Sequence, residues 1–344
     1  MNNLYIVESP LQALCALEVS LENDSESNSV VVRTSGGVRP RNDKQLLSII
    51  NKREWQKKIV IEHPISKNPL SHHCRNRAFL SSIESIFGSK VTSLYIGEFR
   101  SSFMHMVRVA LNASNVYLLD DGAASIKAIN NYIKLGYNYP YDNFYPKNLI
   151  KKIIFYVIYN KYIDEHFFNK RLRVVTAFSN DEHVFQRKIS FDNIKKLLMK
   201  DKFINSQSVY YYGSKYSEAG IISLEYEMYF LGRIRDFYDK RGKKVTYFAH
   251  RDESEQKLNY ISNTLMFNVI VPDVTAEVYL LESDSLPSEV SGAYTSVLNN
   301  IKVILPEVPL RSFKLNSDDV GLQWRDDIEN VYQYFKKLNI HVEV

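Results

Sequence analysis

The sequence predicts an α/β protein made of two Rossmann-like domains. Short apolar segments rich in β-branched residues alternate with stretches of about ten residues that have helical periodicity, a pattern typical of βαβ units on a parallel sheet. The alternation occurs in two blocks, and the 344 residues exceed the roughly 250–300 at which single cores stop growing. We therefore expect an N-terminal domain at 1–205 and a C-terminal domain at 206–344, with an aromatic and basic helical insertion at about 132–202.

In the first block, each predicted strand leads into a helix. Ser9-Pro10 ends the first strand, and leucines then recur at helical spacing. The expected strands cover 4–7, 30–33, 58–62, 91–96 and 116–119, and the expected helices cover 11–21, 43–51, 77–87 and 103–111.

The second block repeats the alternation. Gly213-Ser214 ends its first strand, and Gly242 ends its first helix. Leu286-Pro287 is interpreted as a turn leading into the segment 290–300. The expected strands cover 209–212, 245–248, 269–271 and 302–305, and the expected helices cover 223–240 and 276–282.

Charge and cysteine content exclude several classes of protein. The net charge of +5 is weaker than a dedicated nucleic-acid binder carries, so no nucleic-acid partner is expected, whereas an anionic ligand or membrane fits. Cys15 and Cys74 form no CxxC pair, which favours a reducing cytoplasm over a disulfide framework. Residues 1–7 lack a secretory pattern, and no apolar run approaches the roughly 18–20 residues that span a bilayer.

Polar residues that directly follow strands are the first candidates for chemistry. In open α/β sheets, ligands bind beyond the carboxyl ends of the strands. Four places qualify in this sequence: Ser9, Asp120 with Asp121, Gly213 with Ser214, and His250 with Arg251.

Two of these places carry groups that titrate. Adjacent carboxylates at Asp120 and Asp121, held by Gly122, are able to give one raised pKa and hence a general base. An ordinary Asp-Gly turn is the alternative, and it is favoured when the motif is considered alone. His250 is a candidate general acid or phosphate ligand beside the fixed charge of Arg251, although a lone histidine after a strand is more often structural.

The segment 291–296, Ser-Gly-Ala-Tyr-Thr-Ser, precedes an apolar helical stretch. Free N–H groups and hydroxyls at a helix start make an anion site that suits a nucleotide phosphate. Ordinary N-capping explains Thr295 and Ser296 equally well. The sequence holds neither a P-loop nor GxGxxG, so the ATP and NAD fingerprints are absent.

Five segments bring these residues together in a fixed order: LYIVESPLQALCALE, LLDDG, YYGSKYSEAG, VTYFAHRDE and LPSEVSGAYTSVL. In this order they resemble bacterial sialyltransferases and polysialyltransferases. LLDDG matches the D/E-D/E-G motif of those enzymes, and the last three segments are similar to their donor-binding half. The resemblance covers about 1–125 and 209–305.

The resemblance implies a GT-B-like enzyme that transfers sialic acid, with inversion, from a CMP-sugar to a hydroxyl of a bacterial surface glycan such as lipopolysaccharide, O-antigen or capsule. Asp120 would be the base, Asp121 would tie down its loop, and His250 would protonate or hydrogen-bond the departing phosphate. The implied donor-binding residues are Gly213, Ser214, Arg251, Pro272, Glu277, Ser291, Gly292, Thr295 and Ser296, and the implied acceptor-side residues are Ser9, Pro10, Gln12 and Gly122. No cofactor and no metal are expected.

One departure leaves the donor open. The second motif of the family is usually His-Pro, whereas this chain has His250-Arg251, and its His63-Pro64 lies in the wrong half and is interpreted as a decoy. Legionaminic and pseudaminic acids therefore stand beside sialic acid as donor sugars. A transferase of the same fold that uses a UDP- or GDP-sugar and a noncatalytic glycan-assembly protein remain alternatives, and a zinc site at His72-His73-Cys74 is disfavoured because adjacent ligands rarely close a tetrahedron.

The stretch 147–173 is basic and aromatic, and residues 146–201 hold twelve Lys or Arg against six Asp or Glu. Such a stretch suits peripheral contact with an anionic membrane on the cytoplasmic face. A solvated basic face, or a helical insertion packed on the N-terminal domain, explains it equally well. The sequence also leaves a dimer open.

Overall fold

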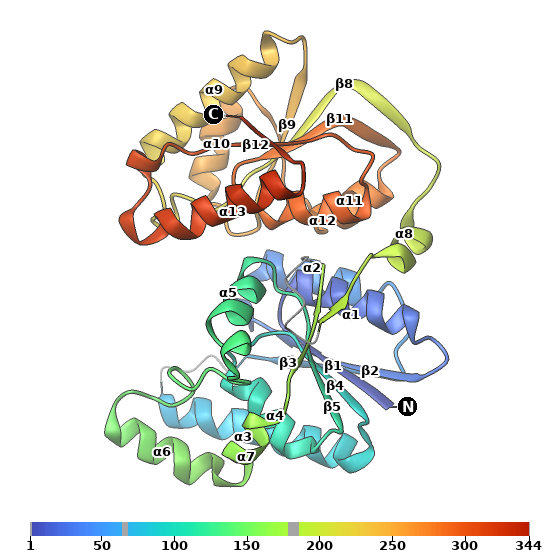
Figure 1. Ribbon diagram of the computed structural model, residues 1–344, viewed down its shortest axis with the longest axis vertical. Coiled ribbons are helices and arrows are strands. Elements are labelled where there is room, and N and C mark those ends of the chain that lie inside the picture. Colours follow the sequence, from blue (N-terminus) through green and yellow to red (C-terminus); the bar gives the residue numbers. More distant parts are fainter. Residues whose placement is uncertain (1, 64–67, 178–185, 344) are drawn as a thin grey trace. The chain divides into compact units, whose positions relative to one another are not determined.

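A computed structural model describes residues 2–63, 68–177 and 186–343. The chain divides into two compact units, Met1–Ile189 and Ser190–Val344. Each unit contains one parallel sheet with helices on both faces (Figure 1). The boundary between these units, at 189/190, comes before the 205/206 boundary expected from the sequence. Residues 190–205 therefore belong to the second unit.

Unit 1 has a seven-stranded sheet in the order β3-β2-β1-β4-β5-β6-β7, in which the paired strands run parallel. The strands are β1 (Asn2–Val7), β2 (Ser27–Thr34), β3 (Lys57–Glu62), β4 (Ser93–Ile96), β5 (Asn115–Leu118), β6 (Arg173–Thr176) and β7 (Gln186–Lys188). The helices are α1 (Pro10–Glu22), α2 (Pro40–Ile50), α3 (Pro69–Phe87), α4 (Ser102–Leu111), α5 (Ala123–Asn131), α6 (Leu149–Tyr159) and α7 (Glu165–Asn169). Helix α1 packs beside α2, and α3 packs beside α4.

Unit 2 has six parallel strands in the order β10-β9-β8-β11-β12-β13. The strands are β8 (Phe203–Tyr212), β9 (Lys244–Phe248), β10 (Asn268–Ile270), β11 (Ser285–Gly292), β12 (Leu310–Phe313) and β13 (His341–Glu343). The helices are α8 (Asp192–Leu198), α9 (Leu224–Asp239), α10 (Glu255–Asn263), α11 (Ala276–Glu282), α12 (Ser296–Ile304) and α13 (Arg325–Lys337). When the strands of each unit are numbered from one along the chain, both sheets have the order 3-2-1-4-5-6, and unit 1 adds a seventh strand at the end.

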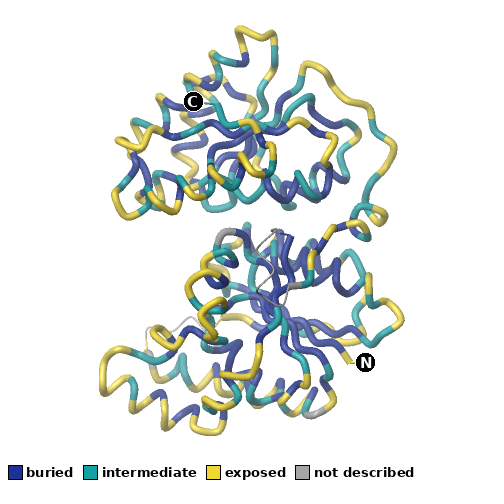
Figure 2. Tube along the Cα trace, in the orientation of Figure 1, coloured by how far each residue is buried: buried dark blue, intermediate teal, exposed yellow. Residues whose placement is uncertain are grey.

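Tyrosine fills part of both cores, which are dark blue in Figure 2. Tyr5, Tyr95 and Tyr117 are paired in register on β1, β4 and β5, and their rings stack with centroids 4.5 and 4.7 Å apart. In unit 2, Tyr211 and Tyr247 stack across β8 and β9 with centroids 5.7 Å apart. Much of the high tyrosine content therefore serves packing rather than sugar contact.

Two sequence predictions in unit 2 were wrong. The strand expected at 302–305 is the end of α12, because Leu298, Ile301 and Ile304 are buried at helical spacing, and a short apolar run does not distinguish a helix from a strand. The turn expected at Leu286-Pro287 lies inside β11. Proline lacks the N–H that a ladder needs, and the pairing of β11 with β8 shifts register between Pro287 and Glu289.

The stretch at 132–202, which was expected to be helical, also contributes strands. It contains α6, α7 and α8, but β6 and β7 inside it extend the sheet of unit 1. β6 has only four residues, Arg-Val-Val-Thr, and β7 is Gln-Arg-Lys, which is polar throughout, so their sequence carries little strand signal. Among the described residues, the structure contains no helix with the length and apolar character needed to cross a membrane.

Candidate active site

In both sheets, the strand order reverses at one point. The reversal lies between β1 and β4 in unit 1 and between β8 and β11 in unit 2. The connections on either side of such a point leave on opposite faces of the sheet, so a crevice opens at the carboxyl ends of the strands. The sequence-predicted site residues follow β1 and β5 in unit 1 and β8, β9 and β10 in unit 2, and they continue from the last residues of β11 into the start of α12.

Ser9 and Gln12 organise the edge of unit 1. Ser9 caps α1, its Oγ accepting from the Gln12 N–H at 3.3 Å, and Pro10 opens the helix. Gln12 is buried and its Oε1 accepts from the Glu8 N–H at 2.8 Å. At Gly97, just after β4, a Cβ would lie 2.1 Å from that same oxygen, so only glycine fits. The sequence analysis missed Gly97, although a glycine directly after a strand was a usable signal.

Asp120 is buried, with 1% of its surface exposed. Its Oδ2 accepts from Thr176 Oγ1 at 2.6 Å and from the Ala177 N–H at 2.9 Å, while its Oδ1 accepts from the Gly122 N–H at 2.9 Å. Burial raises the pKa of Asp120, and these hydrogen bonds oppose the rise. Asp120 thereby joins the end of β5 to the end of β6 and to Gly122, whose φ of +68° suits glycine.

Asp121 has a different environment, because it is half-buried. Its Oδ1 accepts from Ser9 Oγ at 2.9 Å, and its N–H donates to Ser125 Oγ at 2.6 Å. Burial first, and then the nearby charge of Glu98, raise the pKa of Asp121 to about 7. Of the two carboxylates, Asp121 is the one that reaches the surface, and its pKa lies where a general base works near neutral pH.

In unit 2, Gly213 allows Tyr247 to cross the end of β8. A Cβ at Gly213 would lie 2.0 Å from the Tyr247 hydroxyl oxygen. That hydroxyl donates to Glu253 Oε1 at 2.6 Å, and the Gly213 N–H donates to the Phe248 carbonyl at 2.9 Å. A side chain at Gly213 would therefore displace the ring that supports the loop after β9.

The loop that carries His250 is fixed from both sides. The His250 N–H donates to Glu253 Oε2 at 2.5 Å, and the Asp252 N–H donates to His250 Nδ1 at 3.1 Å. An Nδ1 that accepts a backbone N–H holds no proton. Neutral His250 therefore carries its proton on Nε2, as a hydrogen-bond donor.

A buried lysine supports this loop and the end of β8. Lys257 Nζ contacts Glu227 at 2.5 Å and Glu253 at 2.8 Å, and donates to the Ser214 carbonyl at 2.9 Å. Glu218 also contacts it, at 3.2 Å. Burial by itself would lower the pKa of Lys257, but the surrounding carboxylates have the larger effect, so this pKa is raised. Burial raises the pKa of Glu253 to about 7.

The sequence analysis missed this network. Glu253 and Lys257 are spaced i,i+4 at the start of α10, which by itself looks like an ordinary surface pair. The network positions the backbone of both His250 and Ser214.

The segment 291–296, which joins the end of β11 to α12, divides into a buried and an accessible part. Ser291 is fully buried in β11 and its Oγ lies 3.5 Å from the Tyr210 carbonyl. A Cβ at Gly292 would lie 2.8 Å from Thr295 Cγ2. Thr295 caps α12 by accepting from the Val297 N–H at 3.3 Å, and both Thr295 and Ser296 are half-exposed. Of the residues expected here to bind phosphate, Thr295 and Ser296 at the helix start are accessible, whereas Ser291 is not.

The remaining donor-side positions lie farther along the same edge. Arg251 and Pro272 are half-exposed after β9 and β10. Glu277 is buried at the start of α11 and its Oε1 accepts from Asn300 Nδ2 at 2.7 Å, which ties α11 to α12.

His63, His72 and His73 of unit 1 belong to other elements than Asp121, which follows β5: His63 comes directly after β3, and His72 and His73 lie near the start of α3. His63 follows β3, and burial together with Arg33 and His72 lowers its pKa to about 4; Pro64 lies outside the described residues. His72 Nε2 contacts Asn76 at 3.0 Å, and His73 Nδ1 contacts the hydroxyl of Tyr159 at 3.1 Å. Within 2–63, 68–177 and 186–343, no three His, Cys, Asp or Glu side chains are grouped to hold a metal ion.

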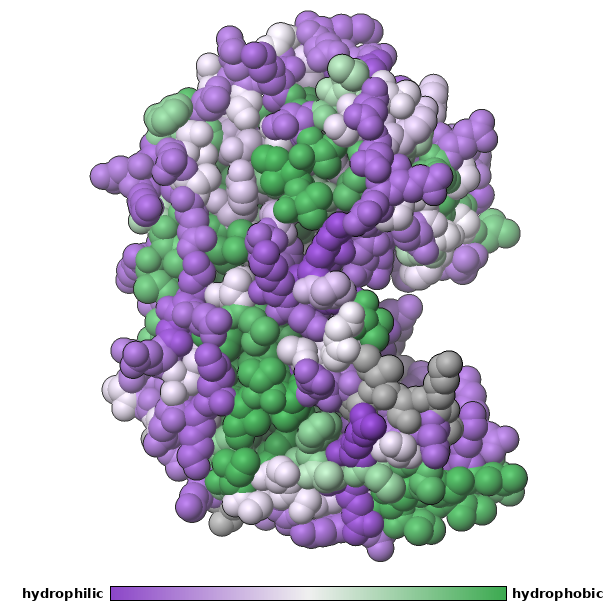
Figure 3. Space-filling model, turned by 180° about the vertical axis from the view of Figure 1, so that it is seen from behind, coloured by the Kyte–Doolittle hydropathy of each residue, from purple (hydrophilic) through white to green (hydrophobic). Residues whose placement is uncertain are grey.

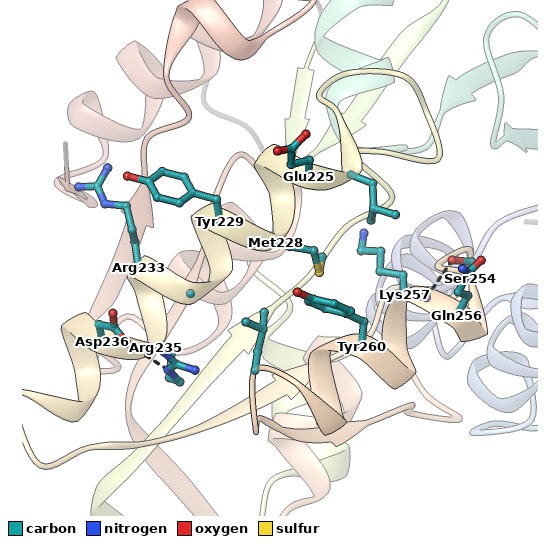
Figure 4. Close-up of a pocket in the computed structure, with 13 residues that line it drawn as sticks. Glu225, Met228, Tyr229, Arg233, Arg235, Asp236, Ser254, Gln256, Lys257 and Tyr260 are labelled. Carbon is teal, nitrogen blue, oxygen red and sulfur yellow. Dashed lines mark hydrogen bonds and ion pairs between the residues drawn. The ribbon is translucent and has the colours of Figure 1, made fainter.

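A cavity of about 680 Å³ lies between α9 and α10 (Figure 4). Met228 and Tyr229 line it from α9, and Lys257 and Tyr260 line it from α10. Lys257 belongs both to the lining of this cavity and to the network behind His250.

The family model of the α-2,8-polysialyltransferases (POLYST) matches residues 3–307. The chain belongs to this family. It is thus a glycosyltransferase that depends on CMP-sialic acid, as the five ordered segments predicted. No curated protein matches the sequence.

Solved structures show the fold of this polysialyltransferase. A protein from Listeria monocytogenes provisionally named a UDP-N-acetylglucosamine 2-epimerase is 9% identical, covers 99% of this chain and 91% of its own, and superimposes with a TM-score of 0.53. A second UDP-N-acetylglucosamine 2-epimerase is 10% identical, covers 98% and 87%, and has a TM-score of 0.51. At such identities the likeness shows the fold alone, and the predicted GT-B-like class with two Rossmann-like sheets is confirmed.

The close approach at Gly213 yields a first prediction. Gly213→Ala places a methyl group against Tyr247 and should break its hydrogen bond to Glu253, so we expect CMP affinity to fall at least about tenfold, measured by calorimetry. Gly232→Ala is the matched control, because Cβ there meets only Leu265 at 3.9 Å. Because Gly232 lies inside helix α9, the Gly232→Ala protein should keep its CMP affinity and gain about 0.5–1 kcal/mol in free energy of unfolding. Equal CMP affinity in both variants would contradict the proposed role of Gly213.

The buried network yields a second prediction. Lys257→Met leaves Glu227 and Glu253 buried without their cation, so the free energy of unfolding of unit 2 should fall by about 3–5 kcal/mol in urea titrations. Lys244→Met, at an exposed lysine on β9, should change it by no more than about 0.5 kcal/mol. A Lys257→Met protein as stable as the Lys244→Met protein would show that the network does not hold this part of the fold.

Proposed function

We propose that the enzyme transfers sialic acid with inversion, that unit 1 supplies the base, and that the strand-end crevice of unit 2 binds the CMP-sugar. The acceptor hydroxyl attacks the anomeric carbon as its proton passes to a carboxylate. The bond between that carbon and the phosphate oxygen breaks, and CMP leaves with the bonding electrons. The observation that carries the proposal is the match of the polysialyltransferase model over residues 3–307, which includes both sets of strand-end residues.

For the base we propose Asp121. The family resemblance favours Asp120, but three hydrogen bonds occupy the oxygens of Asp120 and almost none of it is exposed. Asp121 is half-buried, accepts from Ser9, and has a pKa of about 7. In this proposal Asp120 is a positioning residue that fixes the loop and Asp121 receives the proton.

For the leaving group we propose His250 and the start of α12. With Nδ1 accepting from the Asp252 N–H, the ring proton of neutral His250 lies on Nε2, and we assign this N–H as the donor to the departing phosphate. The half-exposed Thr295 and Ser296 stand at the positive end of the α12 dipole, which stabilises phosphate charge. In this proposal His250 acts as a hydrogen-bond donor to the phosphate through Nε2.

For the substrates we propose CMP-sialic acid and a sialylated glycan of the bacterial surface, because the family name specifies an α-2,8 linkage. Legionaminic and pseudaminic acids are the alternative donor sugars, since Arg251 replaces the usual proline after the histidine. UDP- and GDP-sugars would use the same fold but different base contacts.

The experiment measures CMP release by the purified protein from CMP-sialic acid, with and without an oligosialic acceptor, across pH. Because the base must be deprotonated, kcat/KM should rise with pH and level off above an inflection near 7. Asp121→Asn should lower kcat about 10²- to 10⁴-fold and remove the inflection. A panel of CMP-legionaminic, CMP-pseudaminic, UDP- and GDP-sugars assigns the donor.

Two variants sharpen this test. Glu98→Gln removes a negative charge that raises the pKa of Asp121, so the inflection should move to lower pH while turnover persists. Asp120→Asn distinguishes the carboxylates: if a folded Asp120→Asn protein loses the inflection while Asp121→Asn keeps it, the base is Asp120. Absence of CMP release from every CMP-sugar would contradict the proposed reaction as a whole.

A further inference from the structure

Helix α6 (Leu149–Tyr159) carries an apolar face that no described residue covers. Its other face is buried: Phe155, Ile158 and Tyr159 lie in the core of unit 1, where the helix packs against α3. The exposed side chains are Leu149 at 71%, Ile150 at 69%, Ile153 at 55%, Ile154 at 38% and Val157 at 69%.

These five residues form one continuous stripe. Leu149, Ile153 and Val157 are spaced i,i+4, as are Ile150 and Ile154, so all five project from the same side of the helix. Figure 3 shows apolar surface gathered where α6 lies, at the lower right of that view. Scattered exposed apolar residues are ordinary, but five on three turns of one helix mark an interaction surface.

The charges of α6 and of the segment that leads into it have one sign. Lys147, Lys151 and Lys152 stand at the start of α6, and no Asp or Glu occurs between Asp142 and Asp164. Lys161, by contrast, is paired with Glu84 at 2.7 Å. Tyr145 and Tyr156 stack with centroids 5.1 Å apart, and Tyr145 also contacts Glu165 at 3.3 Å.

We propose that the exposed face of α6 docks into the surface of an anionic lipid bilayer. Apolar residues on one side, lysines at the rim and tyrosines beside them are the composition of a helix that lies in the interface. With 11 residues, α6 is about 16 Å long at 1.5 Å per residue, far short of a roughly 30 Å hydrocarbon core, so it lies on the membrane and does not cross it.

A second copy of the chain fits this face less well. A symmetric pairing of two α6 helices would bring six lysines to one interface with no acidic residue of the helix to match them. Anionic headgroups provide the complementary charge, and each lysine near the surface raises the affinity for the membrane about fivefold. The proposed membrane contact is separate from the transfer reaction and does not depend on the choice of donor, base or acceptor.

The test is sedimentation of the full chain with vesicles, without substrate. We expect binding to vesicles of phosphatidylcholine with about one third phosphatidylglycerol, weaker binding to phosphatidylcholine alone, and release by high salt. The triple variant Ile150→Glu, Ile153→Glu and Val157→Glu should lower the partition coefficient at least about a hundredfold. Substituting Lys147, Lys151 and Lys152 by Gln should lower only the binding to anionic vesicles.

Leu322→Glu is the matched control, because Leu322 is 78% exposed but belongs to unit 2; its binding should equal that of the unaltered protein. CMP release to a soluble acceptor should be unchanged in every variant, which separates this proposal from the proposed reaction. No binding to anionic vesicles, or equal binding by the triple variant, would overturn the proposal. A dimer in solution that the triple variant abolishes would overturn it in favour of a second copy.

Discussion

The parallel arrangement of the strands is the constraint on which the rest of the molecule depends. Parallel neighbours need crossover connections, so helices cover both faces of each sheet and only the strand ends remain for ligands. In both units the strand order reverses once, between β1 and β4 and between β8 and β11. The candidate residues follow strands near these points, where the backbone opens beside a buried sheet.

At the strand ends of each unit, a buried ionisable side chain fixes a loop. The partners of that side chain differ between the two units. Asp120 is surrounded by neutral donors from Thr176, Ala177 and Gly122, which leaves Asp121 as the accessible carboxylate. Lys257 is surrounded by carboxylates, and through Glu253 it fixes His250. In each case a buried group defines where its neighbour points, so loss of either should act through position as well as charge.

The sequence predicted the fold class and most strands, because alternation of β-branched runs with helical stretches is a local signal. It failed at 302–305 and at Leu286-Pro287, where burial across the sheet rather than local pattern decides the structure. The candidate residues were found by their place after strands. The environments of these residues could not be predicted in this way. The burial of Asp120 depends on Thr176, 56 residues away, and the burial of Ser291 depends on β8. Lys257 was missed because its role arises only from contacts made by the folded chain, whereas Gly97 carried a usable signal, its place directly after a strand.

The structure of the protein in complex with CMP is the most direct measurement of the central claim, that the strand-end crevice of unit 2 binds the donor nucleotide. The account predicts the phosphate within hydrogen-bond distance of His250 Nε2 and of the N-terminus of α12 at Ser296. CMP bound instead in the cavity between α9 and α10, or at the edge of unit 1, would contradict it.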